Sequence, residues 1–208
     1  MPILATKLYI PPPRAKIVLR PRLIERLNEG LSSGRKLTLI SASAGFGKTT
    51  LVSEWFGSCG RLVAWLSLDE GDNDPVRFIS YLIAALQSIK AGIGEGLLVA
   101  LHASRPQPPQ NETILTALLN EISVIPDHFL LVLDDYHIID SKPDVFLHPY
   151  CVGVHLIIIG RRVWLISLPR IYVNGFKIPP PLFLQYLQLA RTNSHKHTPF
   201  RSGFSQDI

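Results

Sequence analysis

Cysteine is nearly absent from this sequence, which has only Cys59 and Cys151 among its 208 residues. Two cysteines so far apart form neither the disulfide framework of a small secreted protein nor the paired spacing of a zinc site. The amino-terminal segment also has no apolar core of signal-peptide length, since its first ten residues are followed at once by three prolines at residues 11–13. These absences exclude a disulfide-rich extracellular domain and predict a cytoplasmic location.

Long apolar runs are missing as well. The most apolar stretch, residues 152–160, is too short to cross a bilayer and is ended by Arg161 and Arg162. We therefore expect a buried strand there and no membrane partner. Apolar residues make up 47% of the chain and charged residues 18%, so the sequence can build a packed core and is not generally disordered.

Acidic residues are almost absent from the two ends of the chain. Residues 1–36 carry 8 Lys and Arg against 2 Asp and Glu, and residues 145–208 carry 7 against 1, whereas residues 37–144 carry 6 against 13. A basic end is one mark of a nucleic-acid surface. Here, however, the basic residues are scattered among Leu, Ile, Phe and Pro, so we expect no specific DNA binding by this chain.

Short apolar runs alternate with segments of helical periodicity. Continuous apolar strands are buried on both faces, which is typical of a parallel sheet covered by helices. The expected fold class is thus α/β, a three-layer sandwich with a mainly parallel sheet that is incomplete or irregular towards the C-terminus. Strands are expected at residues 36–41, 62–68, 129–134 and 155–160, and helices at residues 20–33, 49–56, 75–89 and 111–124.

The chain divides into three parts. Residues 1–19 are predicted to form an extended arm, because the triple proline prevents a helix. Residues 20–175 form the α/β domain. Residues 176–208 form an irregular basic tail, in which only residues 181–190 have the pattern of a helix.

The strongest functional motif lies between the first expected strand and the next helix. It matches a phosphate-binding loop, with alanine in place of the first glycine. Gly45 and Gly47 allow the backbone to curl so that its N–H groups point at phosphate oxygens, and the helix amino end adds a positive dipole. Lys48 would neutralise the β and γ phosphates, and Thr49 would offer its hydroxyl to Mg²⁺. The candidate nucleotide-binding residues are Ala42, Ser43, Ala44, Gly45, Phe46, Gly47, Lys48, Thr49 and Thr50.

Two carboxylates end the third expected strand. Because ligands of open α/β sheets bind at the carboxyl ends of the strands, Asp134 is expected to hold Mg²⁺ opposite Thr49, and Asp135 to orient an attacking water. Arg161 directly follows the fourth expected strand and could sense the γ-phosphate, or could simply close the strand at the surface. Arg20, before the first helix, could approach the nucleotide base or remain solvated.

The remaining polar residues favour structural interpretations. We expect residues 69–74 to form a solvated acidic loop in which Asp74 caps the helix that begins at Pro75, with part of the mouth of the site as the alternative. His155 is expected to be a hydrogen-bonded core histidine, and Trp55 and Trp65 are expected to be core residues.

Several segments resemble MalT-like, LuxR-type bacterial transcription regulators, which are signal-transduction ATPases of the STAND class with an AAA-like nucleotide-binding domain. The resemblance covers about residues 5–144. The segments that carry it are TKLYIPPPR, RPRLIERLNEGL, KLTLISASAGFGKTTLVSEW, VAWLSLDEGDNDPVRFISYLIAALQ, ILTALLNEI and LVLDDYHIID.

The resemblance implies a function for each motif. The loop around Lys48 and Thr49 corresponds to the Walker A motif that binds ATP and Mg²⁺, and Asp134 and Asp135 correspond to the Walker B acids. Arg161 and, more weakly, Arg20 align with arginines of the family. Residues 145–154 depart from the family pattern, because they are too short and proline-broken for the helix usual there, and no family pattern is visible from Phe176 onward.

The leading hypothesis is an ATP-binding, slowly or conditionally hydrolysing regulatory domain. The family's sensor, winged-helix and DNA-binding parts are not found in this sequence, which suggests a truncated member. ATP or ADP is the expected partner, with self-association or a regulatory protein as further partners. A self-sufficient P-loop ATPase and a non-functional fragment remain alternatives, and turnover without a partner would favour the former.

Overall fold

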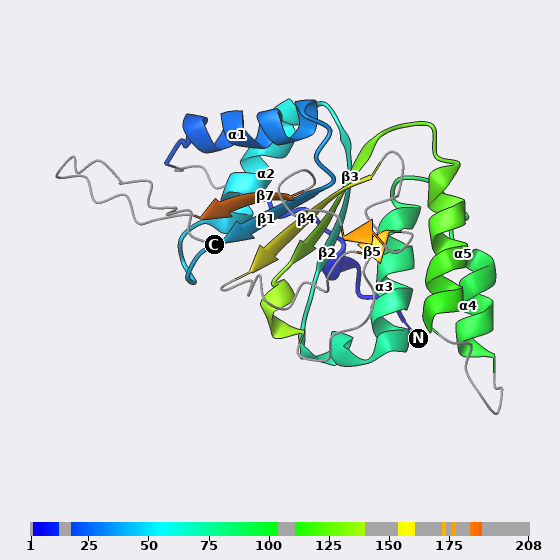
Figure 1. Ribbon diagram of the computed structural model, residues 1–208. Coiled ribbons are helices and arrows are strands. Elements are labelled where there is room, and N and C mark those ends of the chain that lie inside the picture. Colours follow the sequence, from blue (N-terminus) through cyan, green and yellow to red (C-terminus); the bar gives the residue numbers. More distant parts are fainter. Residues whose placement is uncertain are drawn as a thin grey trace.

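The computed structural model describes residues 2–12, 18–103, 111–139, 154–160, 172–173, 176–177 and 184–188. Its centre is a five-stranded sheet whose neighbouring strands all pair in parallel, in the order β2-β3-β4-β1-β7. Figure 1 shows the shared direction of these strands. Their bounds are Leu37–Ser41 for β1, Leu62–Ser67 for β2, Phe129–Asp134 for β3, Val154–Gly160 for β4 and Leu184–Gln188 for β7.

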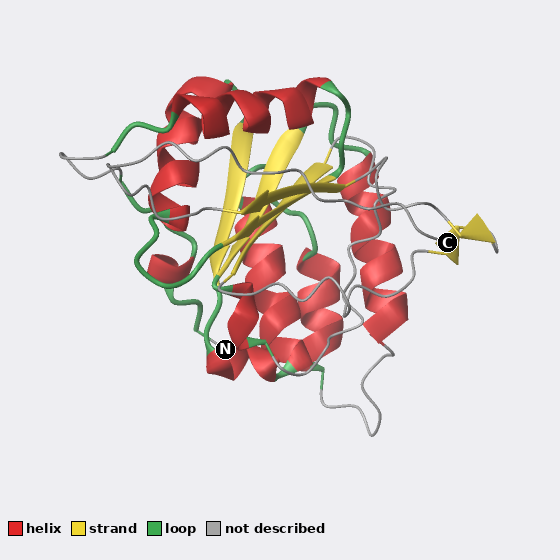
Figure 2. Ribbon diagram, turned by 60° about the vertical axis from the view of Figure 1, so that its left-hand side comes forward, coloured by secondary structure: helices red, strands yellow, loops and turns green. Residues whose placement is uncertain are grey.

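Helices cover both faces of the sheet, as the turned view in Figure 2 shows. On one face, α1 (Pro21–Ser32) and α2 (Lys48–Cys59) pack against the sheet through Leu27 and Trp55. On the other face lie α3 (Pro75–Gln87), α4 (Glu95–His102) and α5 (Asn111–Ser123). The expected fold class, an α/β three-layer sandwich with a mainly parallel sheet, is thereby confirmed.

Strand β3 shows why its sequence is continuously apolar. Leu130 and Val132 belong to the core beneath α1 and α2, whereas Leu131 and Leu133 belong to the core beneath α3–α5. Alternate side chains point to opposite faces of a strand, so a strand covered on both sides has no polar face. All six residues of β3 are buried accordingly.

The expected strands and helices within residues 20–134 and 154–160 are present, with shifts of up to three residues at their ends. Pro21 and Pro75 each occupy the first turn of a helix, and Asp74 caps α3 by accepting a hydrogen bond from the backbone N–H of Arg77. Trp55 and Trp65 are core residues, as predicted. These local signals depend on residues next to one another, which explains why the sequence revealed them.

Two elements differ from the sequence analysis. Helix α4 was not predicted, because its eight residues lie between turn-rich segments. Residues 181–190 were predicted to form a helix, but residues 184–188 form β7, which pairs in parallel with β1 from Leu37↔Leu184 to Ser41↔Gln188. Part of the expected tail therefore belongs to the sheet, because the edge of β1 offers backbone hydrogen bonds that a local helical pattern does not reveal.

Smaller elements complete the described structure. The 3₁₀ turn η1 (Ala5–Lys7) lies in the amino-terminal arm, η2 (Glu70–Asn73) follows β2, and η3 (Tyr136–Ile138) follows β3. Short strands β5 (Tyr172–Val173) and β6 (Phe176–Lys177) form a separate antiparallel pair. Residues 189–208, most of the expected tail, lie outside the described residues.

Candidate nucleotide site

The candidate site lies where β1 ends and α2 begins. Gly45 and Gly47 adopt left-handed backbone conformations, with φ of 80° and 70°. Side chains other than that of glycine are strained at such angles, so both positions favour glycine in this turn. Gly47 is the N-cap residue of α2, and the loop therefore leads directly to the positive end of the helix dipole.

Lys48 is folded back over this loop. Its ammonium donates hydrogen bonds to the backbone oxygens of Ala42, at 3.0 Å, and Ser43, at 3.1 Å. The residue is only 8% exposed. Burying an ammonium group costs free energy unless oxygen atoms accept its hydrogen bonds, and these two backbone oxygens do so. The positive charge is therefore held at the loop, where it would attract an anion.

Thr49 and Asp134 come together across the sheet. The Thr49 hydroxyl donates a hydrogen bond to Asp134 Oδ2 at 2.8 Å, although β4 separates β1 from β3 in the strand order. The other carboxylate oxygen, Oδ1, accepts the backbone N–H of Asp135 at 2.9 Å. Burial raises the pKa of Asp134; the hydrogen bond from Thr49 opposes the rise and the neighbouring Asp135 carboxylate adds to it.

A hydroxyl and a carboxylate at this distance form an oxygen donor pair of the kind that Mg²⁺ accepts, with its remaining positions filled by water or phosphate. The donor set at Thr49 and Asp134 therefore fits a magnesium ion. Among the described residues, no group of three or more His, Cys, Asp or Glu side chains is arranged to hold a metal.

Asp135, the next residue, has a different environment. It has a φ of 55°, and it is the one non-glycine residue with positive φ in the described part of the chain. Its side chain is 52% exposed, and its Oδ1 lies 3.8 Å from His137 Nδ1. Aspartate tolerates left-handed backbone angles better than most residues. The turn at Asp135 therefore leaves the Asp134 carboxylate buried and the Asp135 carboxylate exposed.

Arg20 reaches the loop from the start of α1. Its Nη1 donates a hydrogen bond to the backbone oxygen of Phe46 at 2.8 Å, and a Cβ on Gly47 would lie 3.7 Å from its Nη2. The structure thus brings Arg20 to the same loop as Lys48. A guanidinium fixed at this position adds a second positive charge to the site.

The structure places most of the predicted site residues in one location. The loop residues 42–47 and the first turn of α2, which includes Thr50, adjoin Asp134 and Arg20. Arg161 lies outside the described residues, so its predicted position near the phosphate is not tested.

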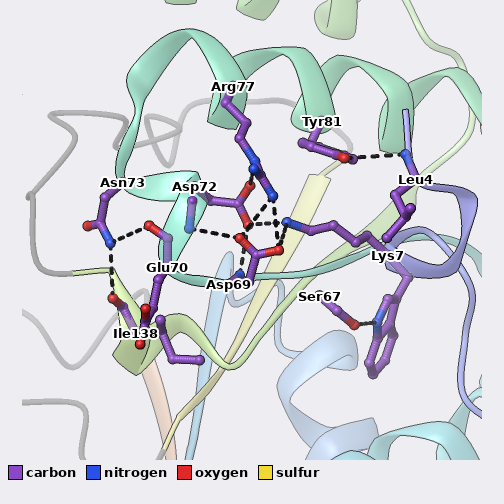
Figure 3. Close-up of polar contacts among 12 residues, drawn as sticks. Leu4, Lys7, Ser67, Asp69, Glu70, Asp72, Asn73, Arg77, Tyr81 and Ile138 are labelled. Carbon is purple, nitrogen blue, oxygen red and sulfur yellow. Dashed lines mark hydrogen bonds and ion pairs between the residues drawn. The ribbon is translucent and has the colours of Figure 1, made fainter. Parts of the chain in front are cut away.

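A second polar cluster lies on the loop after β2, and the sequence analysis did not foresee it. Residues 69–74 were expected to form a solvated loop, but Asp72 is only 1% exposed. Its carboxylate pairs with Lys7 from the arm and with Arg77 from α3, as Figure 3 shows. Lys7 also lies over the ring of Tyr81, 4.4 Å from its centroid. No local signal links Lys7 to Asp72, because 65 positions separate them.

This acidic loop adjoins the candidate site. Asn73 donates hydrogen bonds from Nδ2 to the backbone oxygens of Glu70, at 3.0 Å, and Ile138, at 3.3 Å. Ile138 belongs to η3, which begins one residue after Asp135. The loop after β2 and the loop after β3 are therefore joined at the carboxyl edge of the sheet.

His155 is a core histidine, as predicted, but only its Nε2 has a hydrogen-bond partner among the described residues, since its buried Nδ1 has none. It is buried in β4, and its Nε2 lies 2.8 Å from the hydroxyl of Thr38 in β1. The described part of the chain contains no helix whose length and apolar character would let it cross a membrane.

Comparison with known proteins agrees with the resemblance seen in the sequence. The HTH-type transcriptional regulator MalT of Cronobacter sakazakii is 33% identical over 99% of this chain, which spans 22% of that relative's length. The match extends into residues beyond 176, where the sequence analysis found no family pattern. No family model matches.

Among solved structures, a Walker-type ATPase of Pyrococcus abyssi is 18% identical and aligns with a TM-score of 0.41, covering 73% of this chain and 48% of its own. The sequence relative is the stronger of the two findings. Over nearly its whole length, this chain is related to the MalT-like transcriptional regulators and corresponds to about a fifth of such a protein.

Proposed function

We propose that this chain is the ATP-binding signal-transduction domain of a MalT-like transcriptional regulator, with slow or conditional ATP hydrolysis. The observation that carries the proposal is the hydrogen bond between Thr49, at the end of the phosphate-loop motif, and the buried Asp134. It joins two motifs, 85 positions apart, that the sequence analysis expected to hold one Mg²⁺ between them.

Each loop residue has a part in binding ATP. The backbone N–H groups around Gly45 and Gly47 surround the phosphates, and Lys48 exchanges its bonds to the Ala42 and Ser43 oxygens for bonds to the β and γ phosphates. Arg20, whose Nη1 is hydrogen-bonded to the Phe46 backbone oxygen, would place its positive charge beside the base or the phosphates. The other residues of the loop and the helix start that would surround the phosphates are Ser43, Ala44 and Thr50.

Thr49 and Asp134 would hold Mg²⁺, which neutralises phosphate charge when it is bound. The exposed Asp135 would orient a water molecule towards the γ-phosphate, and Arg161, which lies outside the described residues, would supply a positive charge to the transferred phosphate. In this assignment the protein supplies mainly position and charge, as is usual for phosphoryl transfer.

The relative is a transcriptional regulator, and the chain spans 22% of its length. We therefore place the function of this domain in the cytoplasm, where its nucleotide state would be read by the remainder of such a regulator, by a second copy of the chain, or by a regulatory protein. Promoter binding is assigned to other parts of such a regulator.

The proposal is tested by thermal unfolding with and without MgATP. A ligand that binds only the folded chain stabilises it by about 2.7 kcal/mol at 100 times its Kd, which is a shift of several degrees for a protein of this size. Lys48→Ala should remove the shift, whereas Lys90→Ala, which removes an exposed lysine of the α3–α4 turn, should retain it. Equal shifts in the wild-type protein and Lys48→Ala would reject the assignment. Steady phosphate release without any partner would instead support a self-sufficient ATPase.

A further inference from the structure

A cavity of about 190 Å³ opens at the amino ends of the parallel strands. Its walls include Arg35 and Lys36, which precede β1, and Arg61, which precedes β2. The phosphate-loop motif follows β1 at the opposite edge of the sheet. Because the strands share one direction (Figure 1), the cavity and the candidate nucleotide site lie at opposite edges.

Basic residues gather at the cavity because of the sheet register. Leu62 pairs with Phe129, and Phe129 pairs with Val154, so the segments before these strands meet at one edge. Arg35, Lys36 and Arg61 supply three permanent positive charges, and the exposed His128 adds a polar group. None of the described lining residues is acidic.

The rest of the wall is apolar. Leu31 from the end of α1 and the buried Phe129 line the same cavity as the cations. His155 also lines it; burial lowers the pKa of this ring to about 4, and the nearby charge of Lys36 contributes to the decrease. The ring is therefore neutral at pH 7, and Arg35, Lys36 and Arg61 provide the positive potential.

We propose that this cavity is a second ligand site, separate from the nucleotide site, that binds a small organic anion with a phosphate or carboxylate group on a compact apolar body. The described lining contains three cations and no carboxylate, a composition that attracts an anion, and guanidinium groups bind phosphate or carboxylate oxygens in pairs. The apolar wall favours an organic anion over an inorganic one, because only a ligand with an apolar part can cover this wall and gain free energy by removing it from water.

The probe for this site is phenyl phosphate, measured by isothermal titration calorimetry. The full chain carrying Lys48→Ala is used, because that substitution weakens anion binding at the phosphate loop. We expect saturable binding, weaker binding of inorganic phosphate, which lacks the ring, and no measurable binding of phenol, which lacks the charge. Adding Arg61→Ala should weaken phenyl phosphate binding about tenfold, whereas adding Lys90→Ala should change it less than about twofold.

Arg61 is exposed, so its removal is not expected to unfold the chain, and an unchanged melting temperature would verify this. Lys36→Ala provides a second variant with the same expected direction. The proposal is overturned if phenyl phosphate does not saturate, if Arg61→Ala leaves its affinity unchanged, or if Arg61→Ala and Lys90→Ala weaken it equally. The test does not depend on ATP binding, so its failure and that of the proposed function are distinguishable.

Discussion

Asp134 and Asp135 are adjacent, yet their environments are opposite. Asp134 is 4% exposed and accepts the Thr49 hydroxyl, whereas the Asp135 side chain is 52% exposed beyond a left-handed turn. A buried carboxylate next to a hydroxyl suits a metal, and an exposed one can hold water. The backbone conformation of Asp135 therefore places the two carboxylates in environments that suit the two proposed roles.

This difference predicts the effect of two substitutions. Asp134→Asn should weaken the Mg²⁺-dependent part of ATP binding more than Asp135→Asn, because the amide removes the charge that faces the metal while preserving a hydrogen-bond acceptor for Thr49. The measurement is ATP affinity with Mg²⁺ and with EDTA in each variant. The reverse order of magnesium dependence would exchange the two roles.

His155 predicts a pH dependence of stability. Burial lowers its folded pKa from 6.5 to about 4, so between these values the unfolded chain binds a proton that the folded chain does not. The free energy of unfolding that this neutral ring contributes is fully present above pH 6.5. It decreases as the pH falls towards 4, by about 1.4 kcal/mol per pH unit.

Urea unfolding of the wild-type protein and His155→Gln between pH 5 and 7 would measure this contribution. The variant should lose that part of the slope, whereas the exposed His128→Gln should retain it. Parallel curves for the wild-type protein and His155→Gln would show that the folded ring binds its proton normally.

At the scale of elements, ion pairs and a hydrogen bond connect the amino-terminal arm to the loop after β2 and to α3. Lys7 pairs with the buried Asp72 and with Asp69, and Leu4 donates its backbone N–H to the Tyr81 hydroxyl at 3.3 Å (Figure 3). Through Asn73, the same loop contacts η3 beside Asp135. The predicted arm therefore contacts the domain through the buried Lys7, whereas Leu4 itself remains 58% exposed.

Lys7→Met should lower the free energy of unfolding by about 1–3 kcal/mol, because Asp72 would lose one of its two cationic partners inside the protein. Arg77 would still pair with Asp72, which limits the loss. Urea denaturation measures the effect, with Lys90→Met as the control, which should change stability by less than about 0.5 kcal/mol. If both variants unfold alike, the arm contributes no stability through Lys7.

At the scale of the whole molecule, positive charge is concentrated in the two ends of the sequence and negative charge in the middle. Residues 145–208 carry 7 Lys and Arg against 1 Asp or Glu, but these residues are dispersed in sequence. Dispersed cations bind phosphate backbones without reading bases.

We therefore expect only weak DNA association that decreases steeply with salt and does not distinguish one duplex sequence from another. Fluorescence titration with two unrelated duplexes at physiological and low salt would measure it. Tight binding of one duplex over the other at physiological salt would move the functional centre of the chain from the phosphate loop to its basic end.

The sequence alone was sufficient for the local features. The phosphate-loop motif, the apolar strands that are buried on both faces, the helix start at Pro21 and the cap at Asp74 each depend on residues that are near one another. Local propensity and periodicity determine such features directly. The assignment of β7 as a helix was wrong because a strand at the edge of the sheet depends on its pairing with β1.

Only the tertiary structure decided most of the contacts between distant residues. The motifs already predicted that Thr49 faces Asp134, 85 positions away, but nothing in the sequence predicted the hydrogen bond from Arg20 to Phe46 or the pairing of Lys7 with Asp72, which join residues 26 and 65 positions apart. The cavity at the amino ends of the strands depends in the same way on strand order and register. Contacts of this kind arise from how the layers pack, and packing is a property of the whole chain that no single sequence window contains.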